Sequence, residues 1–502
     1  MNTHDSTAPH RSRSVLMRHH MALSILFFVV SSVMAGFASA ASRVNVLLIA
    51  IDDLRPALGC YDHPTAKTPA MDSLADVGVR FDRAYCQVPL CNPSRASLLT
   101  GRYPSTTRVL DNEAWFRETI PDVVTLPEHF RSHGYTTART GKILHGGLGD
   151  IQSWDTGGQE RTRFPSNLDD RKARKREQAR RAPYSRNRPW HAQDDDDGKP
   201  LGDVETAAEA VELLGSLKNA GKPFFLGVGF AKPHTPFIAP KKFFDLHDPA
   251  RVELPADFSS KPPAALPGAP AVAIPKRNGD LFSAEAATPE AAREAIAAYN
   301  AAVSFTDAQI GRVLAALDDL DLRDNTIVVL FGDHGFHLGE KGKWSKHGSL
   351  YEPAARVPLI ISTPESSRRG KVSERTVELV DIYPTLLEIA GLPASEGVQG
   401  QSLVPLIDNP DAKWDHPAFT VVGQHWAGRF GASIRTERYR YTEWEGPDGG
   451  AELYDYRSDP AEQKNLAAAP AHATTVAELA RRLHASPAFW SVGVDYKQPA
   501  AR

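Results

Sequence analysis

The chain has 502 residues, of which 41% are hydrophobic and 24% charged, a composition that supports a large core and more than one domain. The formal net charge of -3 gives no general reason to expect binding to nucleic acid, so we predict no nucleic-acid partner. Only three cysteines occur, Cys60, Cys86 and Cys91, which excludes a disulfide framework as the basis of the fold. The sequence leaves open whether Cys60 and Cys86 pair.

Residues 1–40 contain basic, apolar and small residues in the order that is typical of a secretory signal. Arginines precede an apolar run over residues 22–33, and the small residues Ala38, Ser39 and Ala40 follow as a cleavage pattern. The apolar run is too short to span a bilayer comfortably, so we expect no stable membrane insertion. We therefore predict cleavage near Ala40 and export to the periplasm or the extracellular space. The alternative is an uncleaved anchor.

A continuous apolar, β-branched run over residues 45–51 predicts a strand buried on both faces, and it ends in Asp52 and Asp53. Open α/β sheets build their sites at the carboxyl ends of such strands. Two adjacent carboxylates repel each other unless a cation compensates them, so we interpret the pair as part of a metal site. The alternative is a solvated loop pair.

Cys91 lies where an extended segment leads into a helix. Residues 68–77 predict a short helix and residues 79–85 a strand or extended lead. After Cys91, a proline and Arg95 open a run that is fit to be a helix. The helix N-terminus favours anionic groups, so the position suits chemistry on an anion. The alternative is a buried structural thiol.

Two further strand ends carry basic side chains. A helix over residues 126–133 and a strand over 135–140 lead into Lys142 and His145. Each of them taken separately would be read as a surface residue, and the roles of anion contact for Lys142 and proton transfer for His145 come from the family resemblance described below. A helix near residues 206–218 precedes a second buried strand over 223–230.

His234 follows that second buried strand between two prolines, which restrict the backbone and so hold the imidazole in place. We expect a catalytic role for His234. The alternative is a satisfied loop histidine.

Between these two regions, residues 151–201 form a charged insertion. A basic block over residues 171–188 is followed by four aspartates at 194–197. Opposed charge blocks of this kind usually form a solvated segment. The alternative is a basic rim for a polyanionic substrate.

A third buried strand over residues 326–331 ends in Asp333 and His334, and a glycine-rich loop with Lys341, Lys343 and Lys346 follows. We expect a cation at the floor of an anion site and these lysines on its walls.

The remaining pattern predicts a long core helix capped by Thr288, an irregular connection before it, and a small antiparallel subdomain near the end. The other predicted elements are a strand at 357–361, a helix at 377–390, strands at 433–442 and 452–456, and a helix at 476–484. The chain is thus predicted to have a main α/β domain over residues 41–410 and an α+β subdomain over 411–502.

The stretch CNPSRASLLTGR, which begins at Cys91, resembles the signature C-x-P-S-R-x-x-L-x-T-G-R of the type I sulfatases and matches it at every specified position. The likeness extends from the Asp52-Asp53 pair through TGK, KPH and DHG to SIRTERYRYTEW and ELYDYRSDP. The resemblance implies an alkaline-phosphatase-like fold, in which helices sandwich a large mixed sheet. It also implies that a formylglycine-generating enzyme oxidises Cys91 to formylglycine, whose hydrated aldehyde is the nucleophile.

Carried over residue by residue, the resemblance implies a divalent cation. Its ligands are Asp52, Asp53, Asp333, His334 and the formylglycine made from Cys91. Oxygen-rich ligation suits a hard ion, and we predict Ca²⁺ in preference to Mg²⁺.

The resemblance also implies the catalytic roles. Lys142 and Lys346 neutralise the sulfuryl oxygens, and His234 protonates the departing sugar oxygen. His145 accepts the proton that releases sulfate, and Arg95 orders the surroundings of the nucleophile.

Within the family, FFLGVGFAKPHTPF, ALDDLDL and HLGEKGKWSK are most similar to the iduronate-2-sulfatase group. The predicted substrate is therefore a sulfated oligo- or polysaccharide, with a 2-O-sulfated uronic acid as the first choice and another sulfated sugar as the second. The nearest alternative is a phosphate mono- or diester or phosphonate hydrolase of the same superfamily. A catalytically inactive, calcium-dependent binder of sulfated polysaccharide is the alternative from a different class.

Overall fold

The computed structural model describes residues 1, 43–158, 190–193, 201–263, 266–274, 280–283, 285–364, 370–424, 429–446 and 449–488. From Val44 onward these residues belong to one compact unit. The predicted signal over residues 2–40 and most of the charged insertion lie outside the described residues, so both stay predictions, as do the domain boundaries. Among the helices that are described, none is both long and apolar enough to cross a bilayer.

Among the described residues, the main sheet has seven strands in the order β3-β5-β1-β7-β8-β2-β9. The strand bounds are β1 (Asn45–Ile51), β2 (Val79–Tyr85), β3 (Thr136–Gly141), β5 (Phe224–Phe230), β7 (Thr326–Gly332), β8 (Arg356–Ser362) and β9 (Lys371–Glu378). Neighbouring strands are parallel except that β8 runs antiparallel to both β7 and β2, so the sheet is mixed. Parallel pairing places the carboxyl ends of β1, β3, β5 and β7 at one edge.

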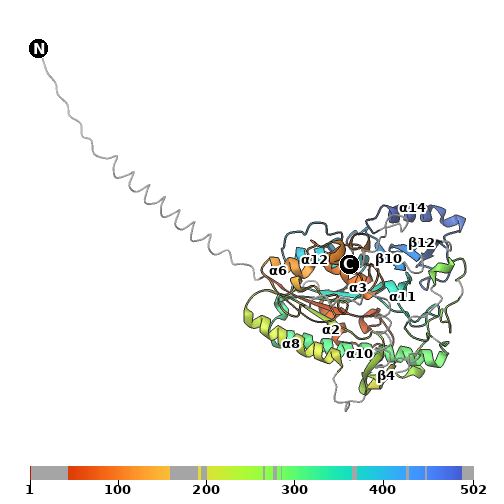
Figure 1. Cartoon of the computed structure of the whole chain (residues 1–502), viewed down its shortest axis with the longest axis horizontal. Helices are drawn as coiled ribbons and strands as arrows, with labels where there is room; N and C mark the ends of the chain where they lie inside the picture. Colours follow the sequence, from red (N-terminus) through yellow and green to blue (C-terminus); the bar gives the residue numbers. More distant parts are fainter. Residues whose placement is uncertain are drawn as a thin grey trace. The chain divides into compact units, whose positions relative to one another are not determined.

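Helices cover both faces of this sheet (Figure 1), because the apolar strands have side chains to bury on both sides. Alternate residues of β1 belong to two different cores: Leu47 and Ile49 to one, and Val46 and Leu48 to the other. The first core includes residues of α2 (Pro69–Val77), α8 (Gly202–Ala220) and α10 (Pro289–Asp319), and the second includes residues of α3 (Cys91–Thr100), α6 (Leu126–Ser132) and α12 (Ile382–Ile389). The predicted sandwich is therefore confirmed.

A second sheet follows along the chain. Its four antiparallel strands are β10 (Ala418–Gln424), β11 (Arg429–Arg435), β12 (Tyr439–Glu445) and β13 (Gly450–Asp455). Helix α14 (Ala473–His484) packs against it, since Leu479 and Leu483 share a core with Ile434 and Leu453. This confirms a C-terminal antiparallel sheet with a helix packed on it.

The smaller elements complete the list. Strands β4 (Trp190–Gln193) and β6 (Phe237–Pro240) form a parallel pair. The short helices are α4 (Pro104–Thr107), α5 (Phe116–Thr119), α9 (Lys241–Phe244), α11 (Glu352–Ala355) and α13 (Val404–Asp408).

Two element predictions are wrong in their bounds. The helix expected over 377–390 begins only at α12, because Val377 and Glu378 pair with Ala84 and Tyr85 and so end β9. The strand expected over 433–442 is two strands, β11 and β12, which pair with each other across a turn. In both cases pairing with distant residues decided between conformations that the local pattern leaves open.

The long helix is confirmed as α10, and the Thr288 side chain caps it by accepting from the Ala291 backbone N–H at 3.2 Å.

Candidate active site

The ends of two adjacent parallel strands bring the predicted acids together. Asp52 and Asp53 follow β1, while Asp333 and His334 follow β7. The backbone N–H of Asp53 donates to Asp333 Oδ1 at 3.1 Å, and His334 Nδ1 lies 3.2 Å from Asp53 Oδ1. All four side chains are buried. The strand register therefore explains why residues that are far apart in the sequence meet.

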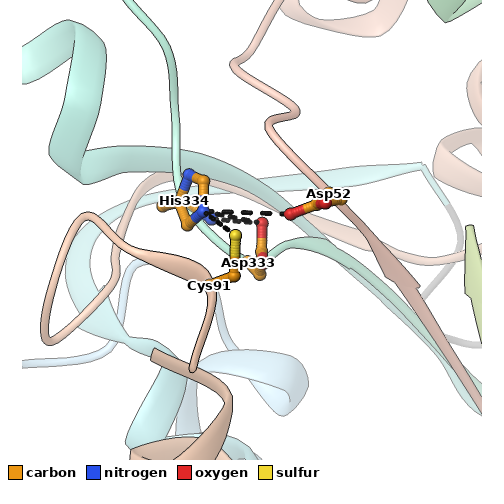
Figure 2. Close-up of side chains that lie close together, drawn as sticks. All are labelled: Asp52, Cys91, Asp333 and His334. Carbon is orange, nitrogen blue, oxygen red and sulfur yellow. Dashed lines mark hydrogen bonds and ion pairs between the residues drawn. The ribbon is translucent and has the colours of Figure 1, made fainter. Parts of the chain in front are cut away.

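Cys91 completes this group as the first residue of α3. Figure 2 shows its thiol beside His334, Asp52 and Asp333, and the candidate ligand atoms of these four residues lie within 4.8 Å of one another. Cys91 Sγ is 3.3 Å from His334 Nε2. Burial, together with the negative charge of Asp52, raises the pKa of the Cys91 thiol well above its ordinary value.

The donor set fits a hard divalent cation. Asp52 Oδ1 is buried and has no hydrogen-bond partner among the described residues, a costly arrangement that a cation would relieve. Burial and the charge of Asp52 hold the pKa of Asp53 well above its ordinary value. Burial acts on Asp52 in the same direction, but Lys142 and other cationic neighbours lower its pKa well below the ordinary value. Asp53 lies beside the four-residue cluster, and its role as a ligand stays a prediction.

Among the described residues, three buried or half-buried cations contact the cluster or Asp53 beside it. Arg95 Nε donates to Asp333 Oδ2 at 2.8 Å, and its guanidinium also binds the Lys142 carbonyl. The ammonium of Lys142 pairs with Asp52 and lies 3.9 Å from Cys91 Sγ. Lys346 Nζ pairs with Asp53 at 2.8 Å. These groups have the charge and position to hold an anion next to residue 91.

The other two lysines of the glycine-rich loop do not form the walls of the site as expected, because their ammonium groups are directed to other partners. Lys341 Nζ binds Asp257 at 2.9 Å and the carbonyl of Ala461 at 2.6 Å. Lys343 Nζ donates to the carbonyl of His347 at 2.8 Å. Among the described residues, Lys346 is the one of these three lysines that pairs with Asp53, beside the cluster.

His234 faces the cluster from the loop after β5. Its Nδ1 is 2.7 Å from the Thr235 carbonyl, which leaves Nε2 directed to the site, 3.9 Å from Asp53 Oδ2. Asp203 holds the loop from α8 by accepting the backbone N–H groups of Ala231 and Lys232, each at 2.8 Å. The loop is therefore fixed by its backbone hydrogen bonds as well as by its prolines.

His145 follows β3 and interacts electrostatically with Asp52 of the same cluster and with Lys142. Burial lowers the pKa of His145 to about 4, and Lys142 contributes to the shift, so the imidazole is neutral and able to accept a proton. Its Nδ1 is buried and has no hydrogen-bond partner in the part of the chain that the structure describes. Asp150, further along the same loop, forms a buried ion pair with Arg117 at 2.6 Å.

Sequence patterns missed several residues that shape the site. Tyr299 of α10 donates its hydroxyl to the Asp53 carbonyl at 2.8 Å and accepts the Arg55 backbone N–H at 3.0 Å. These bonds support Asp53 in a left-handed conformation, with φ of 62°. Asp280 approaches from an irregular segment and interacts with Lys346. The sequence around Tyr299, on the apolar face of a helix, and around Asp280, in a loop, gives no local pattern that would predict contact with the site.

All three cysteines lie among the described residues and are free thiols. Cys86 is fully buried, and Cys60 is partly buried with its backbone N–H bound to Asp72 at 2.7 Å.

Comparison with known proteins gives consistent matches over most of the chain. The profile described as "Sulfatase" matches residues 44–392, and the profile described as "N-sulphoglucosamine sulphohydrolase, C-terminal" matches residues 339–488. A protein named "Sulfatase" from Formosa agariphila is 34% identical, over 90% of this chain and 89% of its own. Mouse iduronate 2-sulfatase is 32% identical, over 85% of this chain and 91% of its own. A solved structure described as a 2-O GAG sulfatase covers 88% of this chain and 91% of its own with a TM-score of 0.66 and 25% identity.

Proposed function

Because the chain belongs to the sulfatase family and has its alkaline-phosphatase-like fold, we propose that it hydrolyses the sulfate ester of a 2-O-sulfated uronic acid. The coarser activity, sulfuric ester hydrolysis on sulfated carbohydrates, is that of its relatives. The observation that carries the proposal is the cluster of Asp52, Cys91, Asp333 and His334 with cations packed around it. The identity of the sugar is supported by the 32% identical iduronate 2-sulfatase.

The residues that would hold the cation are Asp52, Asp53, Asp333, His334 and the modified side chain at position 91. Formylglycine made from Cys91 would supply a hydrated aldehyde as nucleophile, and bound Ca²⁺, which we favour over Mg²⁺, would supply positive charge to the site. The unmodified chain offers a buried thiol at the same place, 1% exposed.

The chain's own groups bind the ester and move its protons. Lys142, 3.9 Å from Cys91 Sγ, and Lys346, which pairs with Asp53, neutralise the sulfuryl oxygens as charge develops on them. Arg95 fixes Asp333 and the backbone at Lys142, and so keeps the anion site rigid. This is electrostatic preorganisation, since the charges are in place before the substrate binds.

Two histidines carry the proton transfers. His234 Nε2 protonates the departing sugar oxygen, because its Nδ1 is engaged by the Thr235 carbonyl. His145 accepts a proton from the side chain at position 91 when sulfate leaves, which its low pKa of about 4 permits at neutral pH. Each role depends on which nitrogen of that histidine's imidazole ring is directed to the site.

The test is turnover of a panel of sulfated oligosaccharides by protein produced with and without a formylglycine-generating enzyme, with sulfate and phosphate release both measured. We expect sulfate release only from the matured protein, and an aldehyde at residue 91 by peptide mass spectrometry. Cys91→Ala should be inactive, whereas Cys60→Ser, which changes a thiol outside the cluster, should remain active.

Phosphate release without sulfate release would favour the phosphoesterase or phosphonate hydrolase. Calcium-dependent binding without release of either would favour the inactive polysaccharide binder. An active protein that retains an unmodified Cys91 thiol would refute the proposed nucleophile.

We also propose export with cleavage near Ala40, on the order of charged, apolar and small residues at the N-terminus. N-terminal sequencing of the protein recovered from the periplasm or medium would test this. An intact N-terminus in the membrane fraction would instead support the uncleaved anchor.

A further inference from the structure

Two polar side chains beside the cluster have no part in the mechanism above, namely Asp280 and His347. Asp280 is brought there by its neighbours in the chain: the Leu281 backbone N–H lies 3.4 Å from the Trp344 carbonyl, and Phe282 packs edge-on against the Trp344 ring at 4.9 Å between centroids. His347 directly follows Lys346. Two loops that are distant in the sequence therefore meet at the edge of the anion site.

The Ser345 hydroxyl holds these two residues in a fixed arrangement. It donates to Asp280 Oδ2 at 2.6 Å and accepts the backbone N–H of His347 at 3.2 Å. His347 Nε2 lies 3.9 Å from Asp280 Oδ1, which is too long for a direct hydrogen bond. One oxygen atom placed between them could lie within hydrogen-bond distance of both. The spacing thus suits a bridging hydroxyl group.

The pair lies near His234, the group that the sugar oxygen would approach in the proposed reaction. Asp280 interacts electrostatically with His234 as well as with Lys346 and His347, and His234 is the proposed proton donor to the sugar oxygen. A carboxylate here would repel a sulfuryl oxygen but accepts hydroxyl donors well. The His347 side chain is 42% exposed and that of Asp280 16%, so the imidazole is within reach of a ligand while the carboxylate is held in place.

We propose that Asp280 and His347 form a recognition site for the hydroxyl group next to the sulfate ester on the leaving sugar. The hydroxyl donates its proton to Asp280 Oδ1 and accepts a hydrogen bond from Nε2–H of His347. Both are specificity-determining residues that act on the sugar and not on the sulfuryl group. This inference rests on the proposed function, which it deepens by naming the part of the substrate that is recognised.

The test compares three probes: a 2-O-sulfated iduronic acid methyl glycoside, its analogue that lacks the neighbouring hydroxyl, and methylumbelliferyl sulfate. Losing a hydrogen bond to a charged group costs roughly 10- to 100-fold, so the wild-type protein should lose that factor in kcat/KM on the deoxy analogue. His347→Ala should lose a similar factor on the hydroxylated sugar, and less than about twofold on the deoxy analogue and the aryl sulfate. Asp280→Asn should lose more on the hydroxylated sugar than on the deoxy analogue, because it removes the charged acceptor of that hydroxyl. His347→Gln, whose amide can still donate, should recover part of the loss.

The matched control is His416→Ala, which removes an exposed histidine from the segment before β10 and should change none of the three rates. Equal losses of His347→Ala on all three probes, in a variant that unfolds at the wild-type temperature, would overturn the recognition role and indicate a structural one. A wild-type protein that leaves the uronoside intact refutes the proposed substrate instead, and the same comparison is then made on whichever sulfated sugar it hydrolyses. No sulfate release from any sugar would overturn both proposals.

Discussion

Arg440 provides a test of how the C-terminal sheet supports the active site. This β12 side chain is 1% exposed and pairs with Glu462 at 2.8 Å and with Glu352 at 2.5 Å. Its guanidinium also donates to the carbonyl of Leu350, in the loop that carries Lys346. The substitution Arg440→Met keeps most of the side-chain volume and removes all of these bonds.

The two acids would be affected unequally. Glu352 keeps Arg435 at 3.5 Å and the hydroxyl of Tyr85 at 2.8 Å. Glu462 keeps the Tyr456 hydroxyl at 2.7 Å and the Glu352 backbone N–H at 2.9 Å, and thus remains a buried carboxylate without the guanidinium that neutralises it. Removing one partner of a buried pair costs about 3–5 kcal/mol, and we expect a loss of unfolding free energy in that range.

Urea unfolding followed by both circular dichroism and tryptophan fluorescence would measure this loss, with coincident transitions as the check on two-state behaviour. The double variant Arg440→Met/Glu462→Gln should recover at least about 1 kcal/mol of unfolding free energy, because it removes the buried carboxylate that has lost its cationic partner. At temperatures where Arg440→Met is folded, kcat should also fall, since the loop next to Lys346 loses its anchor. A change below about 1 kcal/mol in the single variant, or strict additivity in the double one, would refute this account of the buried network.

Three further predictions follow from the site and the core. His234→Ala should reduce kcat roughly 10²–10⁴-fold on a sulfated sugar, whose alkoxide is a poor leaving group, and far less on an activated aryl sulfate. Lys142→Ala should reduce turnover of both substrates. Equal losses of His234→Ala on the two substrates would make His234 a binding residue. Asp333→Ala should remove bound calcium and activity together, as elemental analysis of the dialysed protein and a sulfate-release assay would show, and an unchanged calcium content would contradict its assignment as a ligand. Burial, with a contribution from Asp381, raises the pKa of Glu378 to about 8, and burial raises that of Asp381 to about 7. The folded state therefore binds protons more tightly, so the stability these acids contribute is complete below about pH 4 and is lost as the pH rises to about 8. Glu378→Gln should flatten the fall of the urea midpoint between these limits, and an unchanged pH dependence would show that the pair is not its source.

The sequence by itself determined the elements that end in the site. The apolar runs of β1, β5 and β7 have no polar face, so each had to be buried on both sides, and the residues after them had to lie at the carboxyl ends of buried strands. Asp52, His234 and Asp333 could be placed in this way from chain position alone. The start of α3 at Cys91 could also be predicted from neighbouring residues, namely the polar turn and the proline beside it.

The tertiary structure decided which side chains meet in space. Residue type and spacing alone do not separate Lys346 from Lys341, although the family resemblance assigned Lys346 to the site. In the structure Lys346 pairs with Asp53 and Lys341 with Asp257, because the loop turns between them and the C-terminal segment binds Lys341 through the Ala461 carbonyl. The same holds for Asp280, which reaches His347 through packing against Trp344. Local periodicity reports which face of an element is apolar, whereas contacts between loops depend on the register and packing of distant elements, so they emerge only once the chain is folded.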